Sequence, residues 1–157
     1  MANFTAQAVV NLFAAMKTQA EQSGLFQRVI GHEPRSAPGA GYSYCLWLGP
    51  VQPVGRVSGL GQTAGRVIIN ARVLTPLIEK SEDQIETQML RTILQLIGFY
   101  SGSITVGGTV MEIDLLGAYG VPLEAGNVGY MEIGGSHFRV AELTIPVIID
   151  ALWTQVN

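Results

Sequence analysis

Apolar residues recur at helical spacing in two segments of the chain. In the first, apolar side chains from Phe4 to Ala20 repeat every three or four positions, and Gly24 follows as a C-terminal stop. The second segment, Glu82 to Tyr100, has an apolar stripe with carboxylates near its N-terminal end, where they complement the positive end of a helix dipole. Both segments are predicted to be amphipathic helices.

Residues between these helices alternate with a period of two. Apolar residues at the odd positions from Val67 to Val73 alternate with more polar residues at the even positions, which predicts a strand with one wetter face. The segment Tyr42–Val51 is rich in aromatic and β-favouring residues. We expect it to form a strand that Pro50 and Pro53 end.

Three further strands are expected after the second helix, around Val110–Leu116, Gly129–Ile133 and His137–Ile149. Turns at 117–120 and 134–135 separate them. The order helix, strands, helix, strands favours an α+β fold in which two main helices pack on one face of a largely antiparallel or mixed β-sheet. No internal repeat or domain boundary is evident, so residues 1–157 are expected to form a single domain.

Two connections are rich in proline or glycine. The first, Glu33–Gly41, follows a short β-prone run and contains two prolines and two glycines, which continue neither a helix nor a central strand. The second centres on Gly55–Gly61. We expect extended, exposed loops at 33–41 and 54–64.

The amino-acid composition favours a domain that assembles with other subunits over a free monomer. Charged residues make up 13% of the 157 residues, against roughly 25% in an average soluble domain. The apolar set reaches 48% and mean hydropathy is +0.31, yet no stretch approaches the roughly 20 apolar residues of a membrane span. Burial of the surplus apolar surface between subunits is favoured over an unusually apolar monomer.

Charge and cysteine content narrow the partners. The net charge is −3 and the nine basic residues are spread thinly, which argues against tight nucleic-acid binding. The N-terminus has no secretory signal pattern, and the single cysteine, Cys45, suits a reducing cytoplasm. Cys45 is interpreted as a small buried core residue and not as a reactive thiol.

Motifs for metal, phosphate or nucleophilic chemistry fail on spacing. Gly59, Gly61 and Gly65 precede a strand, so no helix N-terminus is available to bind a phosphate. His32-Glu33 does not begin a zinc motif, because Ser36 stands where the second histidine belongs. No catalytic, cofactor-binding or metal-binding residues are assigned, and no enzymatic activity or cofactor is expected.

One carboxylate pair leaves an alternative open. Glu112 and Asp114 would lie on one face of a strand, which suits general acid–base chemistry if they line a cleft with His137. A small hydrolase is therefore a minor alternative that requires these groups in a closed pocket. The favoured interpretation of Asp114 is a turn-stabilising or inter-subunit carboxylate.

The chain resembles the tail terminator proteins of long-tailed phages, particularly those that infect actinobacteria. The resemblance covers nearly the whole chain in collinear order, and Leu74–Glu82, the lead into the second helix, departs from the family pattern. The matching segments are Ser23–Phe26, His32–Gly39, Ser58–Leu60 with Arg66–Val67, Ile113–Gly120, Gly129–Tyr130, and Ile145–Asp150 with Trp153 and Gln155.

The resemblance implies a structural virion protein at the neck of the phage, assembled in the host cytoplasm. Its copies would form a ring, usually a homohexamer, that caps the tail tube, ends tube polymerisation and offers a surface to the head-completion or connector protein. DNA would pass through the lumen without specific binding, and no membrane is involved. The residues expected at these interfaces are His32, Glu33, Pro34, Arg35, Arg56, Leu60, Arg66 and Asp114.

Other functions remain as alternatives to the ring. Another neck or minor tail component, such as a head-completion protein, would fit the same composition. A free-standing ligand-binding or chaperone-like module would require a deep apolar pocket and a soluble monomer.

Overall fold

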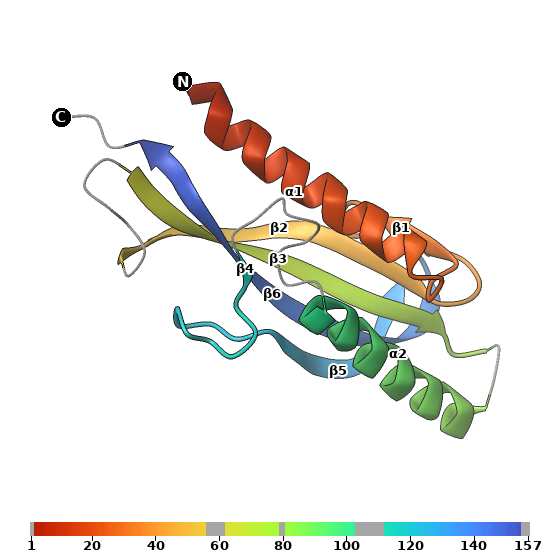
Figure 1. The fold of residues 1–157 in the computed structure, drawn as a ribbon. Helices are drawn as coiled ribbons and strands as arrows, with labels where there is room; N and C mark the ends of the chain where they lie inside the picture. Colours follow the sequence, from red (N-terminus) through yellow and green to blue (C-terminus); the bar gives the residue numbers. More distant parts are fainter. Residues whose placement is uncertain (1, 56–61, 79–80, 103–111, 155–157) are drawn as a thin grey trace.

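A curled mixed sheet forms the centre of the computed structural model, which describes residues 2–55, 62–78, 81–102 and 112–154 (Figure 1). Its strands follow the order β1-β2-β3-β6-β4, and β5 also pairs with β6. The strands are β1 (Arg28–Ile30), β2 (Ser43–Val54), β3 (Gln62–Pro76), β4 (Glu112–Ile113), β5 (Glu124–Ile133) and β6 (Ser136–Thr154). The helices are α1 (Ala2–Gln22) and α2 (Glu82–Gly102).

The ladder between β3 and β6 is the longest in the sheet. It is antiparallel and runs from Gln62 opposite Thr154 to Pro76 opposite Phe138. On the other side of β3, β2 is also antiparallel, whereas β1 pairs with β2 in parallel, which makes the sheet mixed. Beyond β6, β4 and β5 occupy successive parts of the same edge.

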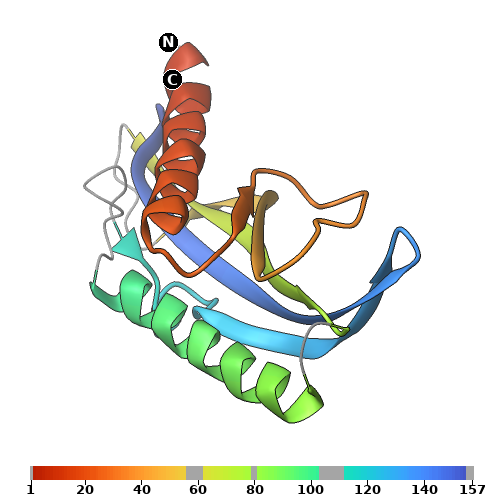
Figure 2. The same cartoon turned by 90° about the vertical axis from the view of Figure 1, so that its right-hand side faces the viewer.

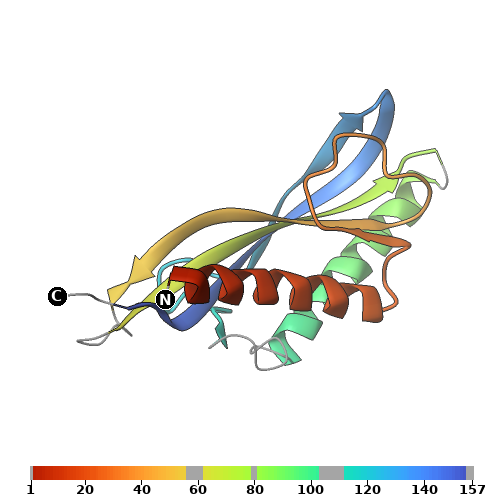
Figure 3. The ribbon, with the colours of Figure 1, turned by 90° about the horizontal axis from the view of Figure 1, so that it is seen from above.

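Both helices pack against one face of the sheet (Figure 3). The odd positions from Val67 to Val73 contribute to this core, as the period-two pattern predicts. The largest buried contributions from the helices are Leu12 and Met16 of α1 and Met89, Leu96 and Tyr100 of α2.

The opposite face carries a second, smaller apolar cluster. Cys45, Leu74, Phe138, Val140 and Ile133 form it. The connection between β1 and β2 lies over this side of the sheet, away from the helices (Figure 2). The sheet is therefore covered on both faces, by helices on one and by irregular segments on the other.

Local capping explains where α1 ends and where α2 begins. At the end of α1, the Ser23 hydroxyl donates to the Ala20 carbonyl (2.6 Å) and Gly24 adopts a φ of +73°. At the start of α2, the Ser81 hydroxyl accepts from the Gln84 amide (3.4 Å), and Glu82 and Asp83 occupy the first turn. Both helix predictions are confirmed.

The prolines do not end the strands as expected. Strand β2 continues through Pro50 and Pro53 to Val54. Past Cys45, β2 pairs only with β3 among the described residues, so prolines on its other edge interrupt no ladder. Pro50 lies where the register between β2 and β3 shifts. Strand β6 likewise continues through Pro146, which has no N–H to donate but whose carbonyl accepts from the Asp114 amide (2.9 Å).

Other strand bounds also differ from expectation. The segment Gln62–Ala64 belongs to β3 and Val54 to β2, so the predicted loop 54–64 is too long at both ends. Strand β4 contains only Glu112 and Ile113 in place of the expected Val110–Leu116, of which 110–111 lie outside the described residues.

The predicted α+β class, with two helices on a mixed sheet, is confirmed. Residues 33–41 contain no helix or strand, as expected. Within the described part of the chain, neither helix combines the length and hydropathy that a membrane crossing requires.

A buried pair of tyrosines provides a test of this packing. The Tyr44 and Tyr100 hydroxyls hydrogen-bond each other at 2.7 Å between β2 and α2, and burial raises the pKa of Tyr100 to about 12. Tyr100→Phe should lower the free energy of unfolding by about 1–3 kcal/mol, because it leaves the Tyr44 hydroxyl buried without this partner.

Urea denaturation of single and double variants measures the effect. Tyr44→Phe combined with Tyr100→Phe should cost less than the sum of the two single substitutions, because neither hydroxyl then remains unpaired. The exposed Tyr130→Phe is the control. Strict additivity would contradict the coupling.

Candidate functional site

The structure groups four of the predicted interface residues on one surface. His32, Glu33, Pro34 and Arg35 line an open depression in the connection between β1 and β2. His32, Glu33 and Arg35 are exposed and Pro34 is half-buried. This part of the predicted interface is accessible on the isolated chain.

The connection that carries these residues is anchored to its own chain. The Gln27 amide donates to the Tyr42 carbonyl (2.8 Å), and the Arg28 guanidinium donates to the Ala40 carbonyl (2.8 Å). Gly41 has a φ of +78°, and a β-carbon there would clash with the Gln27 side chain. The expected exposed loop 33–41 is therefore held in a defined conformation by contacts with its own chain.

Arg72 connects this segment to the sheet. Its side chain is 6% exposed, and it donates to Glu142 on β6 at 2.7 Å and to Glu33 at 3.4 Å. Its guanidinium also lies 4.9 Å from the centroid of the Trp47 ring. Arg72 was not among the predicted site residues, although an arginine in a central strand is a signal for a buried charge pair.

Asp114 organises the turn that follows β4. Its carboxylate accepts from the backbone amides of Ala118 (2.8 Å) and Tyr119 (2.9 Å), and the residue is 4% exposed. Gly117 and Gly120, with φ of +78° and +112°, allow the chain to reverse there. The turn-stabilising interpretation of Asp114 is confirmed, and a contact between this turn and another subunit stays a prediction.

Arg66 links the same turn to the sheet. It donates to the Tyr119 carbonyl (2.6 Å) and to the Gln52 side chain on β2. Its place in the structure is therefore a tether between the turn and the β2 edge. Two other predicted interface residues, Arg56 and Leu60, lie outside the described residues.

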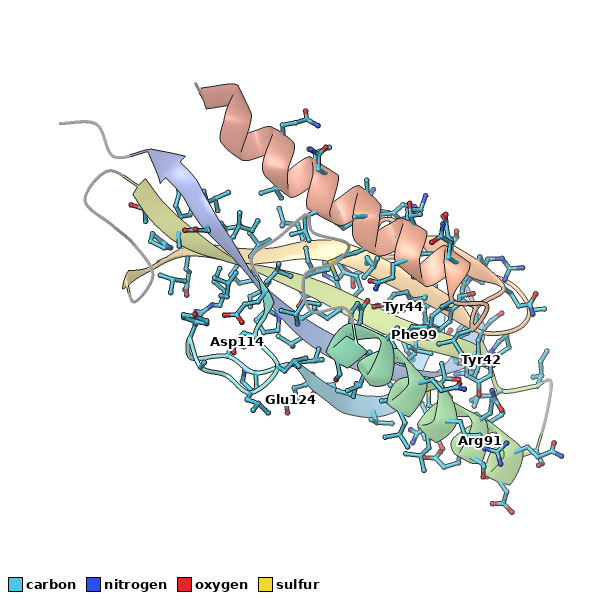
Figure 4. All side chains as sticks on the ribbon, in the orientation of Figure 1. Tyr42, Tyr44, Arg91, Phe99, Asp114 and Glu124 are labelled. Carbon is cyan, nitrogen blue, oxygen red and sulfur yellow. The ribbon has the colours of Figure 1, made fainter. Side chains whose placement is uncertain are left out.

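The three groups proposed for a hydrolase do not meet. Glu112 pairs with Ile148 on β6, whereas His137 lies eleven residues away on the same strand, roughly 35 Å of strand path at about 3.3 Å per residue. Asp114 lies past the end of β4 with its carboxylate turned into its own turn (Figure 4). The prediction that Glu112 and Asp114 share one strand face is wrong, and so is the three-residue cluster.

The buried thiol is not poised for chemistry. Cys45 is fully buried and its pKa is raised to about 12, chiefly by burial, against which nearby Arg72 acts. Because the thiolate is the nucleophilic form, this environment suppresses reactivity at neutral pH. The interpretation of Cys45 as a small core residue is confirmed. Among the described residues, no group of three or more histidine, cysteine or acidic side chains is placed to hold a metal ion.

Large apolar side chains remain exposed on several elements. Leu90 and Leu94 lie one turn apart on α2, Leu48 and Val51 lie on the free edge of β2, and Leu116 is 93% exposed on the Asp114 turn. Among the residues that the structure describes, the other exposed large apolar side chains are Val10, Ile78, Phe99, Val128 and Tyr130.

Substitution of two arginines, Arg72 and Arg139, tests how much the buried Arg72 side chain contributes to stability. Arg72→Gln should lower the free energy of unfolding by about 2–4 kcal/mol, slightly less than for a fully buried ion pair because Glu33 and Glu142 are partly exposed. Arg139→Gln, which removes a pair with the exposed Glu86, should cost about 1 kcal/mol or less. Urea denaturation measures both, and equal costs would contradict the assignment of Arg72 as the anchor.

Comparisons with known proteins leave the family open. No family model matches the chain, and no curated protein matches it. A solved structure named only by a sequence identifier is similar over 94% of this chain and 96% of its own, with 15% identity and a TM-score of 0.43. This likeness is too distant to indicate a family or a function.

Proposed function

We propose that this protein is a structural ring subunit of a phage virion, which caps the tail tube, ends its polymerisation and offers the surface for head-to-tail joining. The observation that carries the proposal is the collinear resemblance to tail terminator proteins from Ser23 to Gln155. The proposal would also give the exposed apolar side chains on α2, β2 and the Asp114 turn protein partners that cover them.

A ring is a consistent use of this surface. In a head-to-tail ring every subunit contributes two different patches to its neighbours, and the two axial sides remain for other proteins. Here those axial partners would be the tail tube protein and a head-completion or connector protein. Exposed apolar residues on several separate elements fit a subunit with several contacts better than one with a single binding site.

The charge of the chain suits the passage of DNA. The net charge of −3, and the pairing of Lys17, Arg72 and Arg139 with carboxylates, disfavour tight binding of a polyanion. We propose that DNA crosses the lumen of the ring without specific binding.

Native mass spectrometry of the purified protein and electron microscopy of virions test this function. We expect closed rings, usually hexamers, in solution or on addition of tail tubes, and density for the protein at the tube end nearest the head. A strictly monomeric protein that is absent from the neck would sink the proposal. A position elsewhere in the neck or tail would favour another head-completion or minor tail component.

Substitutions in the depression lined by His32–Arg35 test whether this surface takes part in assembly. Arg35→Gln or Pro34→Ala should reduce ring closure or head-to-tail joining and leave the fold intact, because neither side chain belongs to a buried cluster. Joining is measured by counting complete particles, and folding by circular dichroism. Lys17→Gln on α1 removes a positive charge elsewhere and is the matched control. Loss of the folded signal in the Arg35 variant would contradict an interface role.

A further inference from the structure

A groove lies along the N-terminal half of α2, on the side that faces the segment after α1. One part is a depression of about 330 Å³ between that segment, the residues just before β2, the end of β3 and the first turns of α2. A second depression continues from it along α2 to Arg91, and Gln88 lines both. We call this surface, lined by Leu25, Gln27, Tyr42, Ile85, Gln88 and Arg91, the interhelical groove.

The lining of the interhelical groove combines three kinds of group. Leu25, Pro76 and Ile85 provide apolar surface at its base. Gln27 and Gln88 provide side-chain amides, which both donate and accept hydrogen bonds. Charged side chains are the third kind: Arg91, which has no ion-pair partner among the described residues, and Asp83, about two turns before it on α2. The surface around Arg91, away from Asp83, fits a peptide segment that carries an apolar side chain near a carboxylate.

The turn 114–123 of the same chain has the complementary character. Leu116 at its tip is 93% exposed, although the turn is held by the two bonds to Asp114, by Arg66 and by the Leu123 amide, which donates to the Asp114 carbonyl at 3.1 Å. Glu124 follows the turn directly, is exposed, and has no ion-pair partner in the described part of the chain. An ordered turn that presents an apolar side chain pays little entropy when it docks.

The groove and the turn lie on different parts of the subunit. Figure 4 places Tyr42 and Arg91 along one half of α2, and Asp114 and Glu124 beyond its other end. A contact between two different patches of one chain is heterologous, and such contacts close into rings or extend into filaments. The free edge of β2 is a weaker candidate for lateral pairing because Pro50 and Pro53 interrupt its hydrogen-bonding groups.

We infer that the turn 114–123 of one subunit docks in the interhelical groove of the next, with Leu116 against the apolar base and Glu124 paired with Arg91. The inference rests on the proposed ring and assigns its lateral contact. We choose a second copy of the chain as the occupant of the groove because Arg91 and Glu124 have opposite charges.

A charge swap in the full chain tests the contact. Arg91→Glu and Glu124→Arg should each weaken self-association at least about tenfold, and the double variant should recover most of the loss. Leu116→Asp should weaken it by a similar factor, whereas Leu116→Met should not. Native mass spectrometry across a concentration series measures assembly, and circular dichroism checks that each variant folds. Lys17→Glu, on α1, is the charge-reversal control.

The outcomes separate this contact from the proposed function. If the wild type forms rings and the double variant assembles no better than the single ones, the contact is wrong and the ring stands. Rings that form normally in all variants but lose binding to tail tubes would mean that another protein occupies the groove, which also overturns the contact. A wild type that never assembles, alone or with tail tubes, would sink the proposed function itself.

Discussion

The pairing of β3 with β6 is the constraint on which the rest of the structure depends. Side chains alternate between the two faces along both strands, so this long antiparallel ladder has one face that needs apolar cover and one that also needs polar partners. The odd positions of β3 from Val67 to Val73 are apolar and need the cover that α1 and α2 provide. The even positions include Arg66, Asn70 and Arg72 and need polar partners as well as cover.

The two arginines of β3 meet this second demand in parallel ways. Arg72, towards one end of the strand, holds the β1–β2 connection through Glu33. Arg66, six residues before it on the same face, holds the Asp114 turn through the Tyr119 carbonyl. Each covering segment therefore has a definite shape because a cation on the sheet satisfies its acceptors, and a segment held in this way can present side chains to a partner at low entropic cost.

This arrangement connects stability with the proposed assembly. The surfaces offered for contact, His32–Arg35 on one segment and Leu116 on the other, are displayed by the same segments that the arginines hold. A substitution at Arg72 or Arg66 would thus affect both folding and assembly, whereas one at Arg35 or Leu116 should affect assembly alone. The low fraction of charged residues fits the proposed assembly. A chain with few charged residues exposes more apolar surface, and partner proteins would cover that surface.

The sequence was sufficient for those features that depend on local periodicity. The two helices, the strand around Val67–Val73 and the α+β class follow from spacings of 3.6 and 2 residues, which each segment carries within itself. The Gly134-Gly135 turn and the role of Asp114 before a glycine-containing turn were also within reach. Strand ends were not, because Pro50, Pro53 and Pro146 are tolerated only where neighbouring strands leave a gap, and that depends on the whole sheet.

Only the tertiary structure decided which distant groups meet. It separated His137 from Glu112 and Asp114, because the partner of Glu112 on β6 lies eleven residues along the strand from His137. It brought Arg72 together with Glu33 and Glu142, because strand pairing places β6 beside β3 and the β1–β2 connection folds back over that face of the sheet. The sequence determined that the chain is rich in apolar and poor in charged residues, and the fold decided which apolar side chains stay exposed.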